Sequence, residues 1–174
     1  MEPSLYTGED PHRILRKGNV VAFICYLKKE NIHIHSAIQS KDELLQRLAV
    51  LAADSGLGVS QQSLFSKLQE REQTMSTGIG NAVGVPHTLV ESVQGLHVFV
   101  ITLRDPIPFD AVDRKPVCVV IGMLGNPEQP NESLGALATL GRILRDESFV
   151  GSLWKACSPE EVYRLFEEKE TKKG

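Results

Sequence analysis

Residues 71–88 hold the densest set of chemistry-bearing groups in this 174-residue chain. They read Arg-Glu-Gln-Thr-Met-Ser-Thr-Gly-Ile-Gly-Asn-Ala-Val-Gly-Val-Pro-His-Thr and contain one histidine, His87. The three glycines allow backbone angles in which successive amides point at one anion. Pro86 has a fixed φ, so we expect His87 to be held in a set direction. The predicted phosphate donors are the backbone of Gly78 and the side chains of Thr74, Ser76, Thr77 and Asn81.

A neutral imidazole is a nucleophile near pH 7, which makes His87 a candidate phosphoryl acceptor. Phosphoryl transfer depends mainly on positioning and charge stabilisation, and a donor-rich loop supplies both. The segment is not a P-loop, because no Gly-x-x-x-x-Gly-Lys-Ser/Thr occurs. It also misses the spacing of the dinucleotide fingerprint by one residue. On spacing alone, a glycine-rich turn without function is the alternative interpretation.

Composition and charge restrict the remaining possibilities. The chain is 41% hydrophobic and 24% charged, as is usual for one globular domain. Its formal net charge of −3 argues against nucleic acid as a partner. We find no signal peptide and no apolar run near the roughly 20 residues of a membrane span, so no membrane insertion is expected. Three widely spaced cysteines favour the reducing cytoplasm, with Cys118 as a small buried hydrophobe.

Cap residues and periodicity predict the elements that position this segment. Helices are expected to begin after caps at Ser40 (with Glu43 in a capping box), Asn131, Asp146 and Ser158, and a further helix is expected to start near Ser60. The helix after Asn131 is expected to bury Leu134, Leu137, Ala138, Gly141 and Leu144.

Strands are expected at three places, and the chain is interpreted as one α/β domain with helices covering a sheet. The run 20–27 fits either a buried strand or a helix. The expected strands are an edge strand at 31–35 and buried strands at 95–103, ended by Asp105–Pro108, and at 117–124. The expected division is an N-terminal arm or extension (1–30), a domain (31–168) and a frayed tail (169–174).

The residues around His87 closely resemble a known family. Arg-Glu at 71–72, Ser-Thr-Gly-Ile-Gly-Asn at 76–81 and Val-Pro-His at 85–87 are similar to the enzyme IIA domain of the fructose/mannitol class in the bacterial phosphotransferase system. The likeness is greatest to its nitrogen-related regulatory branch, and it extends from about Asn31 to about Glu167. Weaker supporting motifs lie at 40–44, 108–113 and 158–162.

This resemblance implies a mixed, roughly five-stranded sheet flanked by helices on both faces. It implies that His87 takes a phosphoryl group from a histidine of an HPr-type carrier protein, with phosphoenolpyruvate as the ultimate donor. Arg71 matches the family's arginine, which lies near the site and helps to bind phosphate or the charge of the donor. No cofactor and no metal are implied.

One position departs from the family pattern. Many members have a second active-site histidine where this chain has Ser133. A serine donates one hydrogen bond to a phosphoryl oxygen but carries no positive charge, so we expect less efficient phosphate stabilisation or onward transfer. Ser133 as the N-terminal cap of its helix is the equal alternative.

Other polar residues have weaker claims to a function. His33 and His35 share one face of a possible strand, but no third metal ligand at a fitting spacing is evident. His97 lies in an apolar strand and is interpreted as structural. Asp110 and Asp113 resemble a catalytic carboxylate pair, although aspartates are also common in turns. Asp113 could still lie near the site if the loops at one end of the sheet converge.

Three functions fit the sequence. The first is a regulatory phosphocarrier that signals through its phosphorylation state to a kinase or transporter. The second is a sugar-specific enzyme IIA that passes phosphate to a membrane permease domain. The third, suggested by Ser133, is a degenerate partner-binding module that needs no phosphorylation. A hydrolase is a distant fourth, because no nucleophile elbow is present.

Overall fold

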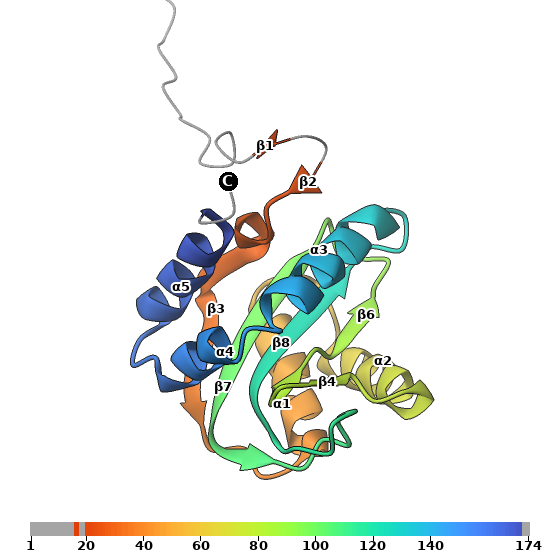
Figure 1. Cartoon of the computed structure of the whole chain (residues 1–174). Coiled ribbons are helices and arrows are strands. Elements are labelled where there is room, and N and C mark those ends of the chain that lie inside the picture. The colour runs from red at the N-terminus through yellow and green to blue at the C-terminus, as the bar shows by residue number, and fades with distance from the viewer. Residues whose placement is uncertain (1–15, 18–19, 172–174) are drawn as a thin grey trace, which may run out of the picture.

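The computed structural model describes residues 16–17 and 20–171, and it has three layers (Figure 1). Two helices, α1 (Lys41–Asp54) and α2 (Gln61–Thr74), cover one face of a central sheet. The other face is covered by three helices and a short 3-10 turn: α3 (Pro130–Ile143), α4 (Glu147–Lys155), α5 (Pro159–Thr171) and η2 (Phe23–Tyr26). No helix in this described part of the chain combines the length and the apolar character that a membrane span requires.

The central sheet has mixed strand directions. Its strands are β3 (Leu27–Ser36), β4 (Gly78–Gly80), β5 (Val83–Gly84), β6 (His87–Leu89), β7 (His97–Ile107) and β8 (Val117–Gly125). The order is β3-β7-β8-β5-β4, and β6 also pairs with β8. The neighbours β7 and β8 are antiparallel, whereas β3 runs parallel to β7, and β5 and β6 run parallel to β8. A short antiparallel ribbon, β1 (Arg16–Lys17) with β2 (Val20–Val21), precedes the sheet.

The predicted mixed sheet with helices on both faces is therefore confirmed, with six strands in place of about five. The extra strand arises because β5 and β6 pair with successive stretches of β8 on either side of Val85–Pro86. Proline has no N–H to donate to a ladder, so the pairing is interrupted there. The carbonyl of Pro86 still accepts a hydrogen bond from the amide of Met123 at 3.0 Å.

Three of the four predicted helix caps are confirmed, and α2 begins directly after Ser60, near which a helix start was predicted. The Ser40 and Ser60 hydroxyls accept hydrogen bonds from the amides three residues later, and Asp146 accepts from Ser148 and Phe149. The Ser158 hydroxyl accepts from the Glu161 amide at 3.2 Å. These caps satisfy helix amides that have no partner within the helix, which is a local property that the sequence reveals.

The prediction for α3 was wrong in two respects. Its cap is Gln129, which makes no side-chain cap bond, and Asn131 already lies inside the helix. Its buried residues are Ala136, Leu140 and Ile143. Of the predicted stripe, Leu144 is buried and Leu137 packs against the core, whereas Leu134 is 62% exposed. Small apolar residues are scattered around this helix, so its sequence fits two apolar stripes of helical spacing, and packing on β8 selects one of them.

The ends of two predicted strands also differ from the structure. The strand β7 continues through Asp105 and Pro106 to Ile107, so the expected break at Asp105–Pro108 was wrong. The pairing of β7 with β8 has an irregularity between Thr102 and Ile107, so Pro106 removes no ladder bond there. The expected edge strand at 31–35 is confirmed as an edge strand, but β3 already begins at Leu27, directly after η2.

The segments predicted as arm and tail are partly described. Residues 1–15, 18–19 and 172–174 lie outside the described residues, and the predicted division at residue 30 falls inside β3. Phe23 and Ile24 are buried in the core, and their amides donate to the Glu170 carboxylate of α5 at 2.9 and 2.8 Å. The predicted burial of Cys118 is confirmed, and burial raises the pKa of its thiol to about 11.

Candidate functional site around His87

His87 begins strand β6, just after the proline that interrupts the ladder. It is half-buried, and it pairs with Met123 of β8. Its Nδ1 lies 2.8 Å from the carbonyl oxygen of Val85. A carbonyl oxygen only accepts hydrogen bonds, so Nδ1 carries the proton and Nε2 keeps its lone pair. The local fold therefore leaves one specific nitrogen of His87, Nε2, unprotonated.

The surroundings of His87 favour its neutral form. Burial lowers the pKa of His87 below the ordinary value, and the positive charge of Arg71 lowers it further. The hydrogen bond to Val85 and the negative charge of Glu72 act in the opposite direction but do not outweigh burial. A lowered pKa leaves more of the imidazole unprotonated near neutral pH, which is the form that can attack phosphorus.

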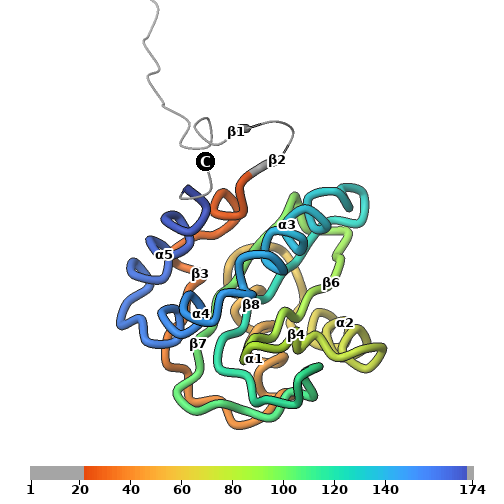
Figure 2. The backbone as a smooth tube through the Cα atoms, viewed as in Figure 1, coloured from red at the N-terminus to blue at the C-terminus, as the bar shows by residue number. Residues whose placement is uncertain are grey.

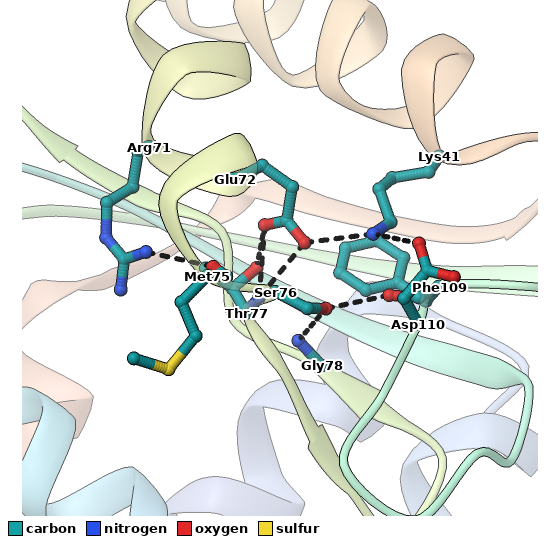
Figure 3. Close-up of polar contacts among 9 residues, drawn as sticks. All are labelled: Lys41, Arg71, Glu72, Met75, Ser76, Thr77, Gly78, Phe109 and Asp110. Atoms are coloured by element: carbon teal, nitrogen blue, oxygen red, sulfur yellow. Dashed lines mark hydrogen bonds and ion pairs between the residues drawn. The ribbon is translucent and has the colours of Figure 1, made fainter.

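Arg71 and Glu72 lie in the last turn of α2, which contacts β6. The guanidinium of Arg71 donates one hydrogen bond to the carbonyl of Met75 at 3.0 Å (Figure 3). The positive charge of Arg71 contributes to the lowered pKa of His87. A guanidinium has five donors in a planar fork, so Arg71 retains donors that suit a phosphoryl group.

The predicted donors Ser76 and Thr77 are already engaged inside the protein. The Ser76 hydroxyl donates to the carbonyl of Phe109 at 2.8 Å and accepts from the amide of Gly78 at 3.2 Å. The amide and hydroxyl of Thr77 both donate to the carboxylate of Glu72 (Figure 3). These side chains thus build the segment beside His87, and Gly78 fits because a methyl group there would lie 2.7 Å from Cα of Ala111.

Asn81 lies at the other end of the glycine-rich segment. Residues 78–84 form a hairpin, with Asn81 and Ala82 in its two-residue turn at φ values of 53° and 60°. The Asn81 side chain donates to the carbonyl of Leu144 at 2.8 Å. Val83 pairs with Val119, and His87 pairs four residues further along β8, so this hairpin end is about 13 Å from His87. The structure does not bring Asn81 to the imidazole.

Ser133 lies on the same side of the sheet as His87. Leu89, two residues after His87 and therefore on the same face of β6, pairs with Gly125 of β8. A methyl group added to Gly125 would lie 2.1 Å from the Ser133 Oγ and 3.2 Å from Leu89. That hydroxyl oxygen is buried and has no hydrogen-bond partner among the described residues. The cap interpretation of Ser133 was wrong, because Gln129 is the cap of α3.

The remaining candidates are separate from His87. Asp110 pairs with Lys41, whereas the Asp113 carboxylate accepts from the Asn81 amide at 2.9 Å at the hairpin end, so the two aspartates do not form a pair. His97 contacts the carbonyl of Gln94 at 2.9 Å. Burial, and secondly Arg47, lower the pKa of His33. Within residues 16–17 and 20–171, no group of three His, Cys, Asp or Glu side chains is arranged to hold a metal ion.

Sequence analysis placed Lys41 and Glu72 in matching motifs but assigned no role to either. The Lys41 ammonium lies 3.1 Å from Glu72 and 2.9 Å from Asp110, and it sits 4.7 Å from the ring centre of Phe109. Two signals were available in the sequence. A lysine at the first position of a helix opposes the helix dipole, and Glu72 follows Leu68 at the spacing of the buried face of α2.

Comparisons with known proteins show the family of the chain. Residues 25–169 match the family described as phosphoenolpyruvate-dependent sugar phosphotransferase system, EIIA 2. The chain belongs to this family. It is 36% identical over 132 residues to the nitrogen regulatory protein of Klebsiella oxytoca, a match that covers 75% of this chain and 80% of that protein.

Two solved structures extend the comparison. The crystal structure of nitrogen regulatory protein IIA-Ntr from Neisseria meningitidis superposes on the enzyme IIA domain with a TM-score of 0.78 and 29% identity, and it covers 82% of this chain and 97% of that one. The complex of mannitol enzyme IIA with phosphorylated enzyme IIB from Escherichia coli gives a TM-score of 0.69 at 23% identity, covering 82% and 97%. The second likeness bears on the fold alone.

Proposed function

We propose that this enzyme IIA domain is a regulatory phosphocarrier that accepts a phosphoryl group on Nε2 of His87. The donor is a phosphohistidine of an HPr-type protein in a phosphoenolpyruvate-dependent system, and the setting is the cytoplasm. The observation that carries the proposal is the Nδ1 contact of His87 with the Val85 carbonyl at 2.8 Å, which leaves Nε2 unprotonated. The similarity to nitrogen regulatory proteins supports the regulatory branch.

The transfer step needs no cofactor. The lone pair of Nε2 forms the new nitrogen–phosphorus bond while the nitrogen–phosphorus bond of the donor breaks, and that electron pair returns to the donor imidazole. The positive charge that develops on His87 is stabilised by the Val85 carbonyl and by the nearby carboxylate of Glu72. Arg71 supplies positive charge for the phosphoryl oxygens, and the Ser133 hydroxyl is a further donor on the opposite side.

A sugar-specific enzyme IIA is the second candidate. The Escherichia coli mannitol enzyme IIA, which shares this fold, has been solved with phosphorylated enzyme IIB. By analogy, His87 would exchange phosphate with an enzyme IIB domain of a sugar permease. Transfer of label from this chain to a purified mannitol-type enzyme IIB would favour this candidate over the regulatory one.

A degenerate binding module is the third candidate, and Ser133 is the residue that favours it. In that case the wild type and His87→Ala would bind a kinase or transporter partner with equal affinity, whether or not phosphate is supplied. A phosphocarrier that acts as a switch would instead change its affinity when His87 is phosphorylated.

Radiolabelled phosphoenolpyruvate, enzyme I and an HPr-type carrier test the acceptor residue. We expect the wild type to be labelled and His87→Ala to remain unlabelled. His97→Ala is the matched control, because it removes another partly exposed imidazole outside the site, and it should be labelled at the rate of the wild type. Label that persists in His87→Ala would overturn the assignment of the acceptor.

A further inference from the structure

A continuous series of polar contacts connects the start of α1 with the imidazole of His87. It begins at the Lys41 ammonium, which contacts Glu72 Oε1 at 3.1 Å. Glu72 accepts from the amide of Thr77 at 3.0 Å and from its hydroxyl at 2.5 Å (Figure 3). The carbonyl of Thr77 accepts from the amide of Val85 at 2.9 Å, and the carbonyl of Val85 meets Nδ1 of His87 at 2.8 Å.

The middle of this series is buried. Glu72 is 8% exposed and Thr77 is 4% exposed, and both lie where α2 gives way to the glycine-rich segment. A buried carboxylate is unfavourable unless it is paired and hydrogen-bonded. Glu72 meets this condition through one cation and two donors of a single residue, so its placement depends on Lys41 and Thr77 together.

Lys41 occupies a position that a helix alone would not favour. It is the first residue of α1, where the helix dipole repels a positive charge. Its ammonium is nevertheless held between Glu72 and Asp110 and lies over the ring of Phe109. The side chain therefore connects three segments that are distant in sequence: the start of α1, the end of α2, and the loop between β7 and β8.

The contacts of Thr77 connect Glu72 to the backbone beside His87. Glu72 holds the amide and the side chain of Thr77, and the Ser76 hydroxyl accepts from the Gly78 amide of the next peptide. The carbonyl of that peptide, of Thr77, accepts from the Val85 amide. Pro86 restricts the backbone of Val85 as well. The Val85 carbonyl is thereby aimed at Nδ1, and it is this carbonyl that selects the His87 tautomer with an unprotonated Nε2. In Figure 2 the backbone runs from the end of α2 into β4 and then to β6.

We propose that Glu72, anchored by Lys41, is a positioning residue that sets the tautomer and direction of His87 through Thr77 and Val85. Its link to phosphoryl transfer rests on the proposed function, but its effect on the imidazole does not. Glu72 makes no direct hydrogen bond with His87, so it acts only through the intervening residues and through its charge.

Nitrogen NMR of the unphosphorylated protein tests this directly, because ¹⁵N shifts of imidazole report which nitrogen holds the proton. Spectra are recorded at about pH 8, where histidine is neutral. In the wild type we expect the proton of His87 on Nδ1. In Glu72→Gln we expect a mixture with a substantial share of the other tautomer, and phosphorylation slowed roughly 10-fold to 100-fold by the misplaced nucleophile.

Asp110→Asn is the matched control. It removes the exposed partner of Lys41 but leaves Glu72, Thr77 and Val85 in contact, so the wild-type tautomer should persist. Thr77→Val is the second test variant, which deletes only the hydroxyl link and keeps the shape of the side chain. It should shift the tautomer in the direction of Glu72→Gln by a smaller amount, and it decides the question if Glu72→Gln does not fold.

An unchanged His87 tautomer in every folded variant among Glu72→Gln and Thr77→Val would overturn the inference. Slower phosphorylation with an unchanged tautomer would also overturn it, since the effect would then come from charge alone. If the wild type accepts no phosphate but the tautomer shifts as expected, the proposed function fails while the positioning role of Glu72 stands.

Discussion

The two sides of His87 are built differently. On the side of α2, the buried polar groups of Glu72 and Thr77 all have partners, and they connect to the imidazole through Val85. On the side of α3, the buried oxygens Glu132 Oε2 and Ser133 Oγ have none among the described residues. A buried oxygen without a partner is unfavourable for folding. In the proposed phosphocarrier, the α2 side would fix the direction of the His87 imidazole, and the α3 side would keep hydrogen-bonding groups available for the phosphoryl group.

The largest effect on stability is expected on the α2 side of His87, where the buried polar groups have partners. Lys41→Met leaves the buried carboxylate of Glu72 without its cation, and we expect the free energy of unfolding to fall by about 3 kcal/mol. Urea denaturation measures this change. Lys67→Met on the exposed face of α2 is the control and should remain within about 0.5 kcal/mol of the wild type. Equal effects of the two substitutions would show that Glu72 does not depend on Lys41.

Substitutions of Arg71 test whether the α2 side of His87 also supplies positive charge to the phosphoryl group. Arg71→Met should slow phosphorylation by about 100-fold, since the cation that stabilises the transferring group is removed. Arg71→Lys keeps the charge but not the planar fork, and it should lose less. Rapid-quench kinetics with the phosphorylated carrier measures both, and thermal melting checks the fold. A wild-type rate in Arg71→Met would remove this residue from the site.

A pair of smaller substitutions compares the two sides directly. Thr77→Val removes a satisfied hydroxyl and should lower the free energy of unfolding by about 1 kcal/mol. Ser133→Ala removes an unpartnered hydroxyl and should leave it unchanged or raise it by up to about 1 kcal/mol. The phosphorylated form of Ser133→Ala should lose its phosphate faster if this hydroxyl binds a phosphoryl oxygen. Equal destabilisation by both would contradict the contrast between the two sides.

The pH dependence of stability provides the smallest predicted effect. The pKa of His87 is lower in the folded protein, so the unfolded chain binds more protons as the pH falls. The stabilisation is complete above the unfolded value of about 6.5 and is lost as the pH falls through the lower folded value. His87→Gln should therefore lose less stability than the wild type between about pH 7.5 and pH 5.5. An unchanged slope, relative to His97→Gln, would contradict the lowered pKa.

Local signals predicted much of this fold. The caps at Ser40, Ser60, Asp146 and Ser158 and the buried strands depend on residues that are close in sequence. The buried face of α3 was predicted incorrectly in part. Its small residues permit two apolar stripes, and only packing on β8 selects one. Strand β7 was predicted to end before Pro106 but continues through it to Ile107. It can do so because the hydrogen-bonded pairing with β8 is irregular between Thr102 and Ile107.

The site was predicted less completely than the fold. The sequence indicated His87 and Arg71, since a histidine behind a proline and a matching motif are both local. It did not indicate the contact of Lys41 with Glu72, because the two lie 31 positions apart and only the packing of α1 against α2 joins them. The glycines of 78–84 were predicted to cradle an anion, but pairing between β4 and β5 makes a hairpin whose turn holds Asn81 away from His87.

The most direct measurement is the position of phosphate on the labelled protein. Phosphorylation by phosphoenolpyruvate, enzyme I and an HPr-type carrier, followed by ³¹P and ¹⁵N NMR, reports both the residue and the ring nitrogen. The geometry of His87 and Val85 predicts a single phosphohistidine, with phosphorus on Nε2 of His87 and the proton on Nδ1. Phosphate on Nδ1, on another histidine, or on no residue would contradict the account.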